Sequence, residues 1–237
     1  MAQGSMTSPE LTVGLLWHSI NSDNLGIGAL TQSHIAILEA AAAQLGIALR
    51  FRVYGWRDPR TPYVVQDNLE AFPMTTRSMT SPRGLYASLR GCDLVCDIGA
   101  GDSFADIYGR RRFAFNVWPK IVALMARRPL VLPPQTIGPF RSKWSARIAA
   151  SLVRRCRIVA LRDDLSAEAL RRMRVRVPTI AACDVAFRLP YRNSDRVPGP
   201  PRVGLNVSGL LFHGGYDRNN MSGLKTDYPA AMRRVIR

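Results

Sequence analysis

Side chains able to transfer protons or bind anions stand directly after the short apolar segments of this chain. In order along the sequence they are His18, Ser19, Asn21, Asp23 and Asn24; Gly99, Gly101, Asp102 and Ser103; Gln135 and Thr136; Arg162 and Asp163; Asp184; and Asn206 and Ser208. Carboxylates and imidazoles can act as acids or bases, and a guanidinium binds carboxylate or phosphate. Turn and helix-capping roles explain any one group equally well. Their recurrence favours a shared binding edge.

Two of these groups contain small residues that would let a ligand approach the backbone. Residues 21–29 place Asn24 and Gly26 at a helix entrance, where backbone N–H groups favour a phosphate or sugar hydroxyls. This stretch matches neither GxGxxG nor the Walker phosphate loop, so it specifies no nucleotide. Within residues 97–106, Gly99 and Gly101 would let the backbone approach a ligand, while Asp102 and Asp106 present their carboxylates.

The apolar segments alternate with amphipathic stretches of helical spacing. Strands are expected at 11–17, 47–54, 93–98, 130–132, 158–161 and 179–182, and helices at 27–45, 113–127, 142–155 and 165–173. Residues 55–83 carry four prolines and no sustained period, which indicates a long excursion outside the sheet. This alternation predicts an α/β fold with a Rossmann-like parallel sheet and helices on both faces, and ligands bind beyond the carboxyl ends of such strands.

The domain prediction is an N-terminal Rossmann-like domain at 1–188, a linker at 189–201 and the start of a second domain at 202–237. The linker is rich in proline and has no apolar period. A further strand is expected at 203–207 and a helix at 228–236. About forty residues cannot bury a core of their own, so the second domain is expected to be incomplete.

Composition excludes several classes of protein without choosing one. The apolar run 11–17 is too short for a signal peptide or a membrane span, which favours the cytoplasm. Four cysteines without CxxC spacing are expected to be reduced core residues, and three scattered histidines imply no metal. A net charge of +16 suits a phosphorylated substrate, nucleic acid or an anionic membrane, but its arginine excess is also typical of GC-rich coding sequences.

Residues 132–140 (LPPQTIGPF) and 160–166 (ALRDDLS) resemble the polysaccharide pyruvyl transferases. The segments at 18–30, 99–104 (GAGDSF), 184–187 (DVAF) and 204–209 (GLNVSG) follow in the order of that family. The resemblance implies transfer of an enolpyruvyl unit from phosphoenolpyruvate to a sugar, which closes a pyruvate ketal on two hydroxyls and releases phosphate. It also implies a fold similar to two-domain glycosyltransferases of the GT-B type, and no cofactor.

The resemblance suggests roles for the strand-end residues. Arg162 would bind the donor anion, with an ion pair to Asp163 or Asp184 as the alternative. Asp102, with Asp106 behind it, would bind the acceptor or transfer protons, and His18 would carry a proton unless it is structural. The remaining expected substrate ligands are Gln135, Thr136, Asn24, Gly26, Gly99, Gly101, Ser103, Asn206, Ser208 and His213.

Three readings of function follow from these residues. The leading one is a pyruvyl transferase of exopolysaccharide or cell-wall polysaccharide synthesis, acting on a sugar or lipid-linked oligosaccharide without specific nucleic-acid binding. Family members continue through a complete second domain with a later histidine and basic residues, so a truncated, inactive binding protein is an alternative. A nucleotide-sugar glycosyltransferase is another, because fold does not determine chemistry. The basic stretch 141–157 adds an expected peripheral contact with the anionic inner membrane face.

Overall fold

The computed structural model describes residues 9–192, 199–200, 203–215, 218–220 and 222–236. The chain divides into two compact units, Met1–Pro190 and Tyr191–Arg237. The first contains a seven-stranded sheet with its helices, and the described residues of the second form two short helices. The predicted linker at 189–201 lies partly outside the described residues, and its role stays a prediction.

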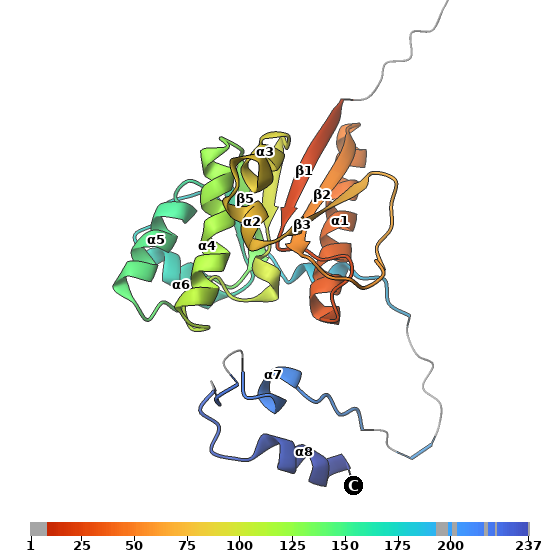
Figure 1. Cartoon of the computed structure of the whole chain (residues 1–237), viewed down its shortest axis with the longest axis vertical. Coiled ribbons are helices and arrows are strands. Elements are labelled where there is room, and N and C mark those ends of the chain that lie inside the picture. Colours follow the sequence, from red (N-terminus) through yellow and green to blue (C-terminus); the bar gives the residue numbers. More distant parts are fainter. Residues whose placement is uncertain (1–8, 193–198, 201–202, 216–217, 221, 237) are drawn as a thin grey trace, which may run out of the picture. The chain divides into compact units, whose positions relative to one another are not determined.

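The first unit is built on one seven-stranded parallel sheet (Figure 1). Its strands are β1 (Glu10–Leu16), β2 (Ala48–Trp56), β3 (Leu69–Met74), β4 (Leu94–Asp97), β5 (Leu130–Gln135), β6 (Ile158–Leu161) and β7 (Thr179–Ala181), in the order β3-β2-β1-β4-β5-β6-β7. Because β1 neighbours β4, the chain winds in opposite directions on either side of this pair. Such a reversal opens a crevice at the carboxyl ends of the two strands. The predicted Rossmann-like α/β sheet is confirmed.

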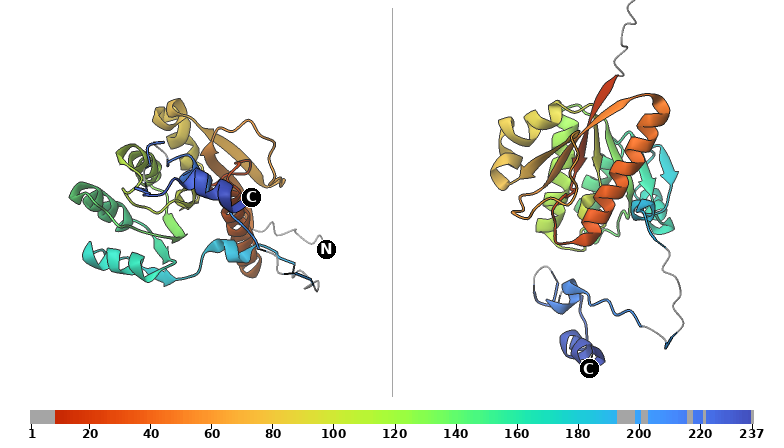
Figure 2. Two further views of the ribbon diagram at one scale, coloured as in Figure 1. Left: turned by 90° about the horizontal axis from the view of Figure 1, so that it is seen from below. Right: turned by 90° about the vertical axis from the view of Figure 1, so that its right-hand side faces the viewer.

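Helices lie on both faces of the sheet (Figure 2), and the alternating side chains of the strands pack beneath them in two core layers. The long helix α1 (Leu25–Leu45) covers one face, where its Ile35 packs with Val13 and Phe51. The other face is covered by α2 (Thr76–Thr80), α3 (Ala87–Arg90), α4 (Arg110–Met125), α5 (Lys143–Val153) and α6 (Asp164–Arg172). Helices therefore cover both faces, as predicted.

The prediction that residues 55–83 lie outside the sheet is wrong. Within them β3 pairs in parallel with β2 at the edge of the sheet, followed by α2 and the helical turn Pro82–Tyr86. An edge strand needs hydrogen bonds on one side only, which is why it accommodates Pro73. Its side chains are largely exposed or half-buried, so it lacks the continuous apolar run of a central strand.

The second unit differs from its prediction at one of two elements. The helix α8 (Tyr228–Ile236) lies where it is expected. The strand expected at 203–207 is wrong, because these described residues are mostly exposed and pair with no strand; the helix α7 (Gly209–Phe212) follows instead. A strand needs a partner, and this unit supplies no sheet among its described residues.

Three of the four cysteines are buried. Cys92, Cys96 and Cys156 are buried as predicted, but Cys183 is exposed because it follows the edge strand β7.

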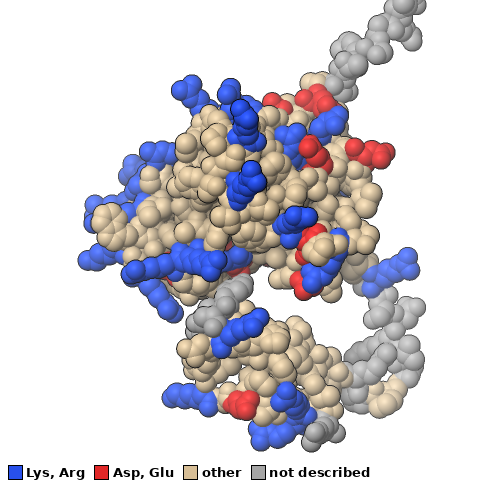
Figure 3. Space-filling view, in the orientation of Figure 1, with Lys and Arg blue, Asp and Glu red and all other residues tan. Residues whose placement is uncertain are grey.

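Lysine and arginine side chains lie widely over the α4 to α6 side of the sheet unit, whereas the visible acidic side chains of that unit gather toward β1 to β3 (Figure 3). In the part of the chain that the structure describes, no helix is long and apolar enough to span a bilayer.

Candidate functional site

A pocket of about 320 Å³ lies at the carboxyl ends of the strands, where the winding of the sheet reverses. We call it the switch pocket. Five predicted site residues line it, namely Asn24, Gly26, Gly101, Asp102 and Arg162, together with Asp184. They come from the loops after β1, β4, β6 and β7. The structure therefore brings together residues that lie up to 160 positions apart.

The amino terminus of α1 forms one wall of the switch pocket. Asn24 caps this helix, and its side-chain oxygen accepts a 3.0 Å hydrogen bond from the backbone N–H of Gly26. A helix of 21 residues directs its positive dipole end at this wall. The wall suits an anion or a hydroxyl oxygen, but Asn24 already uses one of the N–H groups.

Arg162 also lines the switch pocket and is paired within the chain. Its Nη1 donates to Asp184 Oδ2 at 2.7 Å, and its Nε donates to Thr136 Oγ1 at 3.0 Å. Both charged side chains are about one quarter exposed. The alternative given for Arg162, an ion pair with Asp184, is thus present. Nη2 makes no hydrogen bond to any residue of the described ranges, which leaves one edge of the guanidinium for a ligand.

Asp163 secures the loop that carries Arg162. It caps α6 by accepting from Ser166 N–H and Ser166 Oγ, and it accepts from Thr136 Oγ1, each at 2.7 Å. Burial would raise the pKa of Asp163, but these hydrogen bonds and the charge of Arg162 outweigh burial and lower it. Ser166 in turn accepts from the backbone of Ile137 at 2.8 Å. Thr136 therefore positions Arg162 and lies outside the pocket lining.

The two predicted carboxylates differ in their surroundings. Asp102 lines the switch pocket and is held by Arg112, whose Nη2 and Nε both lie 2.7 Å from Asp102 Oδ2. Asp106 is absent from that lining, and its two oxygens accept from the backbone of Arg141 and Ser142 ahead of α5. Burial would raise the pKa of Asp106, but these bonds lower it. The geometry therefore favours a structural role for Asp106.

The loop after β4 turns sharply through Gly99 and Gly101, whose φ angles are +65° and +78°. Gly101 lines the switch pocket, whereas Gly99 packs under Asn116 and Gln135. Gln135 is buried and donates to the backbone oxygen of Asp97 at 2.7 Å, which fixes the same loop from below. Ser103 is half-buried outside the pocket lining. Gln135 therefore supports the site without lining it.

A buried ion pair lies beneath this loop and was not predicted from the sequence. Lys120 Nζ is 3.0 Å from Asp97 Oδ2, and both side chains are fully buried. Lys120 also donates to the backbone oxygen and Oδ1 of Asn116 and lies 4.6 Å from the centre of the Phe104 ring. Burial raises the pKa of Asp97, and the charge of Lys120 opposes this rise. Asp97 Oδ1 accepts from Gly99 N–H, so the pair anchors the loop.

The His18 ring is buried, and its role as a proton carrier stays a prediction. Its Nδ1 lies 2.9 Å from Leu16 O and its Nε2 lies 2.9 Å from His34 Nδ1. Burial and then the neighbouring His34 lower the pKa of His18 well below its ordinary value. With both nitrogens engaged, His18 fits its structural alternative.

The remaining predicted ligands belong to the second unit. Asn206 and His213 are exposed, and Ser208 caps α7 by accepting from Leu211 N–H at 3.3 Å. Their participation in a site with the sheet unit stays a prediction.

Two smaller hollows continue along the same edge of the sheet. The Trp56 hollow, of about 260 Å³, lies over the ends of β1, β2 and β3 and includes His18, Ser19, Asn21, Trp56 and Asp58 in its lining. The connecting hollow, of about 60 Å³, shares Trp56 with it and shares Ile27 and Ala100 with the switch pocket. The three hollows therefore adjoin one another.

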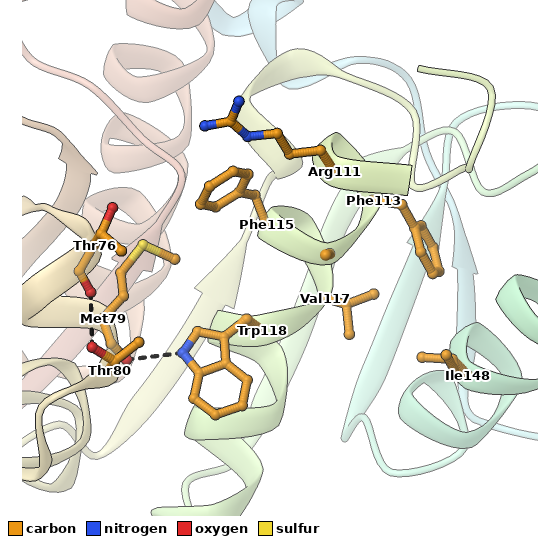
Figure 4. Close-up of a pocket in the computed structure, with 10 residues that line it drawn as sticks. Thr76, Met79, Thr80, Arg111, Phe113, Phe115, Val117, Trp118 and Ile148 are labelled. Atoms are coloured by element: carbon orange, nitrogen blue, oxygen red, sulfur yellow. Dashed lines mark hydrogen bonds between the residues drawn. The ribbon is translucent and has the colours of Figure 1, made fainter. Parts of the chain in front are cut away.

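A larger apolar hollow, of about 550 Å³, lies between α2 and α4 with Ile148 of α5 at its side (Figure 4). Trp118 crosses it and donates its indole N–H to Met79 O at 2.8 Å. Arg111 lies over the ring of Phe115 at its rim. Its lining contains none of the predicted site residues.

Chemically, the carboxyl edge offers a small polar pocket with a guanidinium, a carboxylate and a helix amino terminus. These groups can hold an anion and sugar hydroxyls together. In the described ranges, no group of three or more His, Cys, Asp or Glu side chains could hold a metal ion. The fold and this edge define a Rossmann-like protein with a candidate site for a small molecule.

Comparison with known proteins supplies the family. The sequence model of the family described as Polysaccharide pyruvyl transferase matches residues 30–236, so the chain belongs to this family, which is a family of transferases. The chain is 29% identical over 112 residues to the amylovoran biosynthesis protein AmsJ of Erwinia amylovora. That match covers 47% of this chain and 26% of AmsJ, so it spans about a quarter of the relative's length.

A solved structure is also similar in part. The crystal structure of S. aureus homoserine dehydrogenase at pH 6.0 matches with a TM-score of 0.37 and 12% identity, over 73% of this chain and 33% of that chain. The fold assignment rests instead on the strand order of the sheet itself.

Proposed function

We propose that this chain transfers an enolpyruvyl unit from phosphoenolpyruvate to a sugar of an exopolysaccharide or cell-wall polysaccharide precursor. The observation that carries the proposal is the switch pocket, which gathers Arg162, Asp102 and the start of α1 around about 320 Å³ in a member of this family. That volume is large enough for a small phosphorylated acid.

The reaction closes a ketal without an oxidant or reductant. The methylene carbon of phosphoenolpyruvate gains a proton, one sugar hydroxyl adds to the central carbon, and the bond from that carbon to the phosphate oxygen breaks. The first hydroxyl gives up its proton as it adds, and a second hydroxyl then adds to the same carbon and gives up its own. Of these two protons one replaces the proton taken up by the methylene carbon and the other goes to the released phosphate. We assign Arg162 and the α1 terminus to the donor anion and Asp102 to proton transfer or hydroxyl binding.

Replacing Arg162 by Ala should weaken the binding of phosphoenolpyruvate. Charged hydrogen bonds contribute roughly 1.5–3 kcal/mol, so loss of this ligand should weaken binding at least about tenfold. Isothermal titration calorimetry measures the affinity, with R162K as the variant that retains charge but loses the paired geometry. Arg171→Ala, on the exposed face of α6, is the matched control. Unchanged affinity in R162A would refute the assignment.

Turnover distinguishes the alternatives. The chain is incubated with lipid-linked oligosaccharide and either phosphoenolpyruvate or a nucleotide sugar, and phosphate or nucleotide release is followed with the mass of the acceptor. Phosphate release with a gain of pyruvate ketal supports the proposal, whereas nucleotide release supports a glycosyltransferase. Absence of both, with thermal stabilisation by neither donor, supports a binding protein.

A peripheral contact with an anionic membrane is a further part of the proposal. The α5 helix exposes Trp144, and the guanidinium of Arg147 lies 5.3 Å from the centre of its ring. An exposed indole next to basic side chains suits an anionic lipid surface.

A further inference from the structure

Trp56 is an exposed tryptophan at the edge that carries the candidate site. It ends β2, and 40% of its surface is exposed. Its ring is braced on two sides, by Trp17 with ring centres 5.3 Å apart and by Phe115 at 5.4 Å, edge to face. A braced aromatic side chain loses little conformational entropy when a ligand stacks on it. A large ring that is both exposed and held in place offers a surface on which a ligand can stack.

The backbone brings Trp56 to this place through a close approach. At Gly55 a Cβ atom would lie 2.4 Å from the backbone oxygen of His18, so only glycine lets the end of β2 reach the loop after β1. Trp17 continues the pairing by donating to Tyr54 O at 2.8 Å, and it does so at a φ of +61°. This angle is unusual for a bulky residue and marks strain of the kind that gathers at functional sites.

Trp17 also has a buried polar atom without a partner. Its indole N–H makes no hydrogen bond to any residue of the described ranges, although the side chain is 3% exposed. Trp17 lines the connecting hollow together with Trp56. An unsatisfied buried donor is costly, and a hydroxyl oxygen of a ligand in this hollow is an acceptor that would satisfy it.

The polar rim of the Trp56 hollow is held in place before any ligand arrives. Asn21 Nδ2 donates to Asp58 O at 2.9 Å and to Arg60 O at 3.1 Å, and Asp58 Oδ2 accepts from Arg60 Nη1 at 2.7 Å. Tyr63 donates to the backbone oxygen of Ser19. The loops after β1 and β2 are therefore tied to each other and present hydroxyl, amide and carboxylate groups around the ring.

We propose that Trp56 is the stacking platform of the acceptor subsite, with Ser19, Asn21 and Asp58 as the groups that bind hydroxyls of a pyranose ring. This inference rests on the proposed function for the identity of the second substrate. The connecting hollow joins this subsite to the switch pocket at Ile27 and Ala100. The acceptor therefore lies over β1 and β2, the donor lies toward β4 and β6, and the two meet at the start of the β4 loop.

The test measures binding of a pyranose separately from binding of phosphoenolpyruvate. A panel of methyl hexopyranosides is titrated against the full chain, with saturation-transfer NMR and tryptophan fluorescence as readouts. Trp56→Ala should weaken the best-bound pyranoside about tenfold, because it removes the stacking surface, and Trp56→Phe should stay within about threefold of the parent. Tyr191→Ala removes an aromatic ring that is 83% exposed, outside the three hollows, and should leave the pyranoside affinity unchanged.

Each outcome decides something. Equal pyranoside affinity in W56A and the parent, or no pyranoside binding by the parent, overturns the subsite. Trp56 variants should bind phosphoenolpyruvate as the parent does, whereas a parallel loss of both ligands with a lowered unfolding midpoint in W56A and W56F would show that Trp56 only supports the fold. Pyranoside binding that depends on Trp56 without any phosphoenolpyruvate binding would retain the subsite and refute the pyruvyl transfer.

Discussion

Replacing Lys120 by Met should destabilise the chain strongly, because it leaves a carboxylate in the core without its partner. Lys120 Nζ lies 3.0 Å from Asp97 Oδ2, and both side chains are fully buried. At an effective dielectric constant near 20, unit charges at that separation attract by about 5 kcal/mol. Removing one partner of a buried pair costs roughly 3–5 kcal/mol. We expect K120M to lower the free energy of unfolding by about 4 kcal/mol at pH 8.

The loss should be smaller in acid, because Asp97 can then take up a proton. Burial already raises the pKa of Asp97 against the opposing charge of Lys120, so the pKa rises further in K120M. A carboxyl whose folded pKa exceeds its unfolded value favours the folded state at low pH, and this contribution is lost as pH rises through the folded pKa. K120M should therefore be closer to the parent at pH 5 than at pH 8.

Urea unfolding followed by far-ultraviolet circular dichroism at both pH values measures the effect. The double variant D97N/K120M removes the isolated charge and should recover most of the loss. Lys143→Met, at the exposed start of α5, is the matched control and should stay within about 0.5 kcal/mol of the parent. A loss in K120M that is equal at pH 5 and pH 8 would assign the cost to packing and refute the electrostatic reasoning.

Two further predictions concern the core and the surface. Burial lowers the pKa of His34 from 6.5 to about 4. As pH falls, this imidazole therefore takes up a proton in the unfolded chain before it does so in the folded chain. The free energy of unfolding should be highest above pH 6.5 and should decrease by about 3 kcal/mol toward pH 4. His34→Gln should reduce that decrease in urea titrations, and an unchanged decrease would contradict it. N-ethylmaleimide should add once to the native chain, at the exposed Cys183, as read by mass spectrometry. A second adduct without denaturant would contradict burial of the other three cysteines.

The sequence predicts the central sheet because its strands are continuous apolar runs separated by amphipathic helices. It also predicts that Arg162 and Asp102 lie at one edge, because parallel strands end on the same side. Both line the switch pocket. The individual roles are harder to predict. Gln135 ends β5 and Asp106 lies in the loop after β4, but hydrogen bonds to the backbone engage both side chains outside the pocket lining.

What the sequence does not reveal depends on tertiary packing. Lys120 lies in a helix that begins with three arginines, so nothing in its sequence distinguishes a buried lysine from a solvated one. The strand β3 lies at an edge and lacks an apolar run, and its Pro73 argues against a central strand. The exposure of the Trp56 ring could not be predicted from the sequence either, because a tryptophan at the end of a strand is usually buried in the core.

In the switch pocket Asp184 is bound to Arg162, so its carboxylate competes with an anionic ligand for the guanidinium. Asp184 caps the turn Val185–Arg188 by accepting from Ala186 N–H, and Val185 packs with Leu30 of α1. An anion that binds both Nη1 and Nη2 of Arg162 must draw the guanidinium away from Asp184, so its affinity is reduced by whatever that ion pair contributes. The ion pair with Arg162 therefore holds the stretch from Asp184 toward residue 191 more firmly when no such anion is bound than when one is.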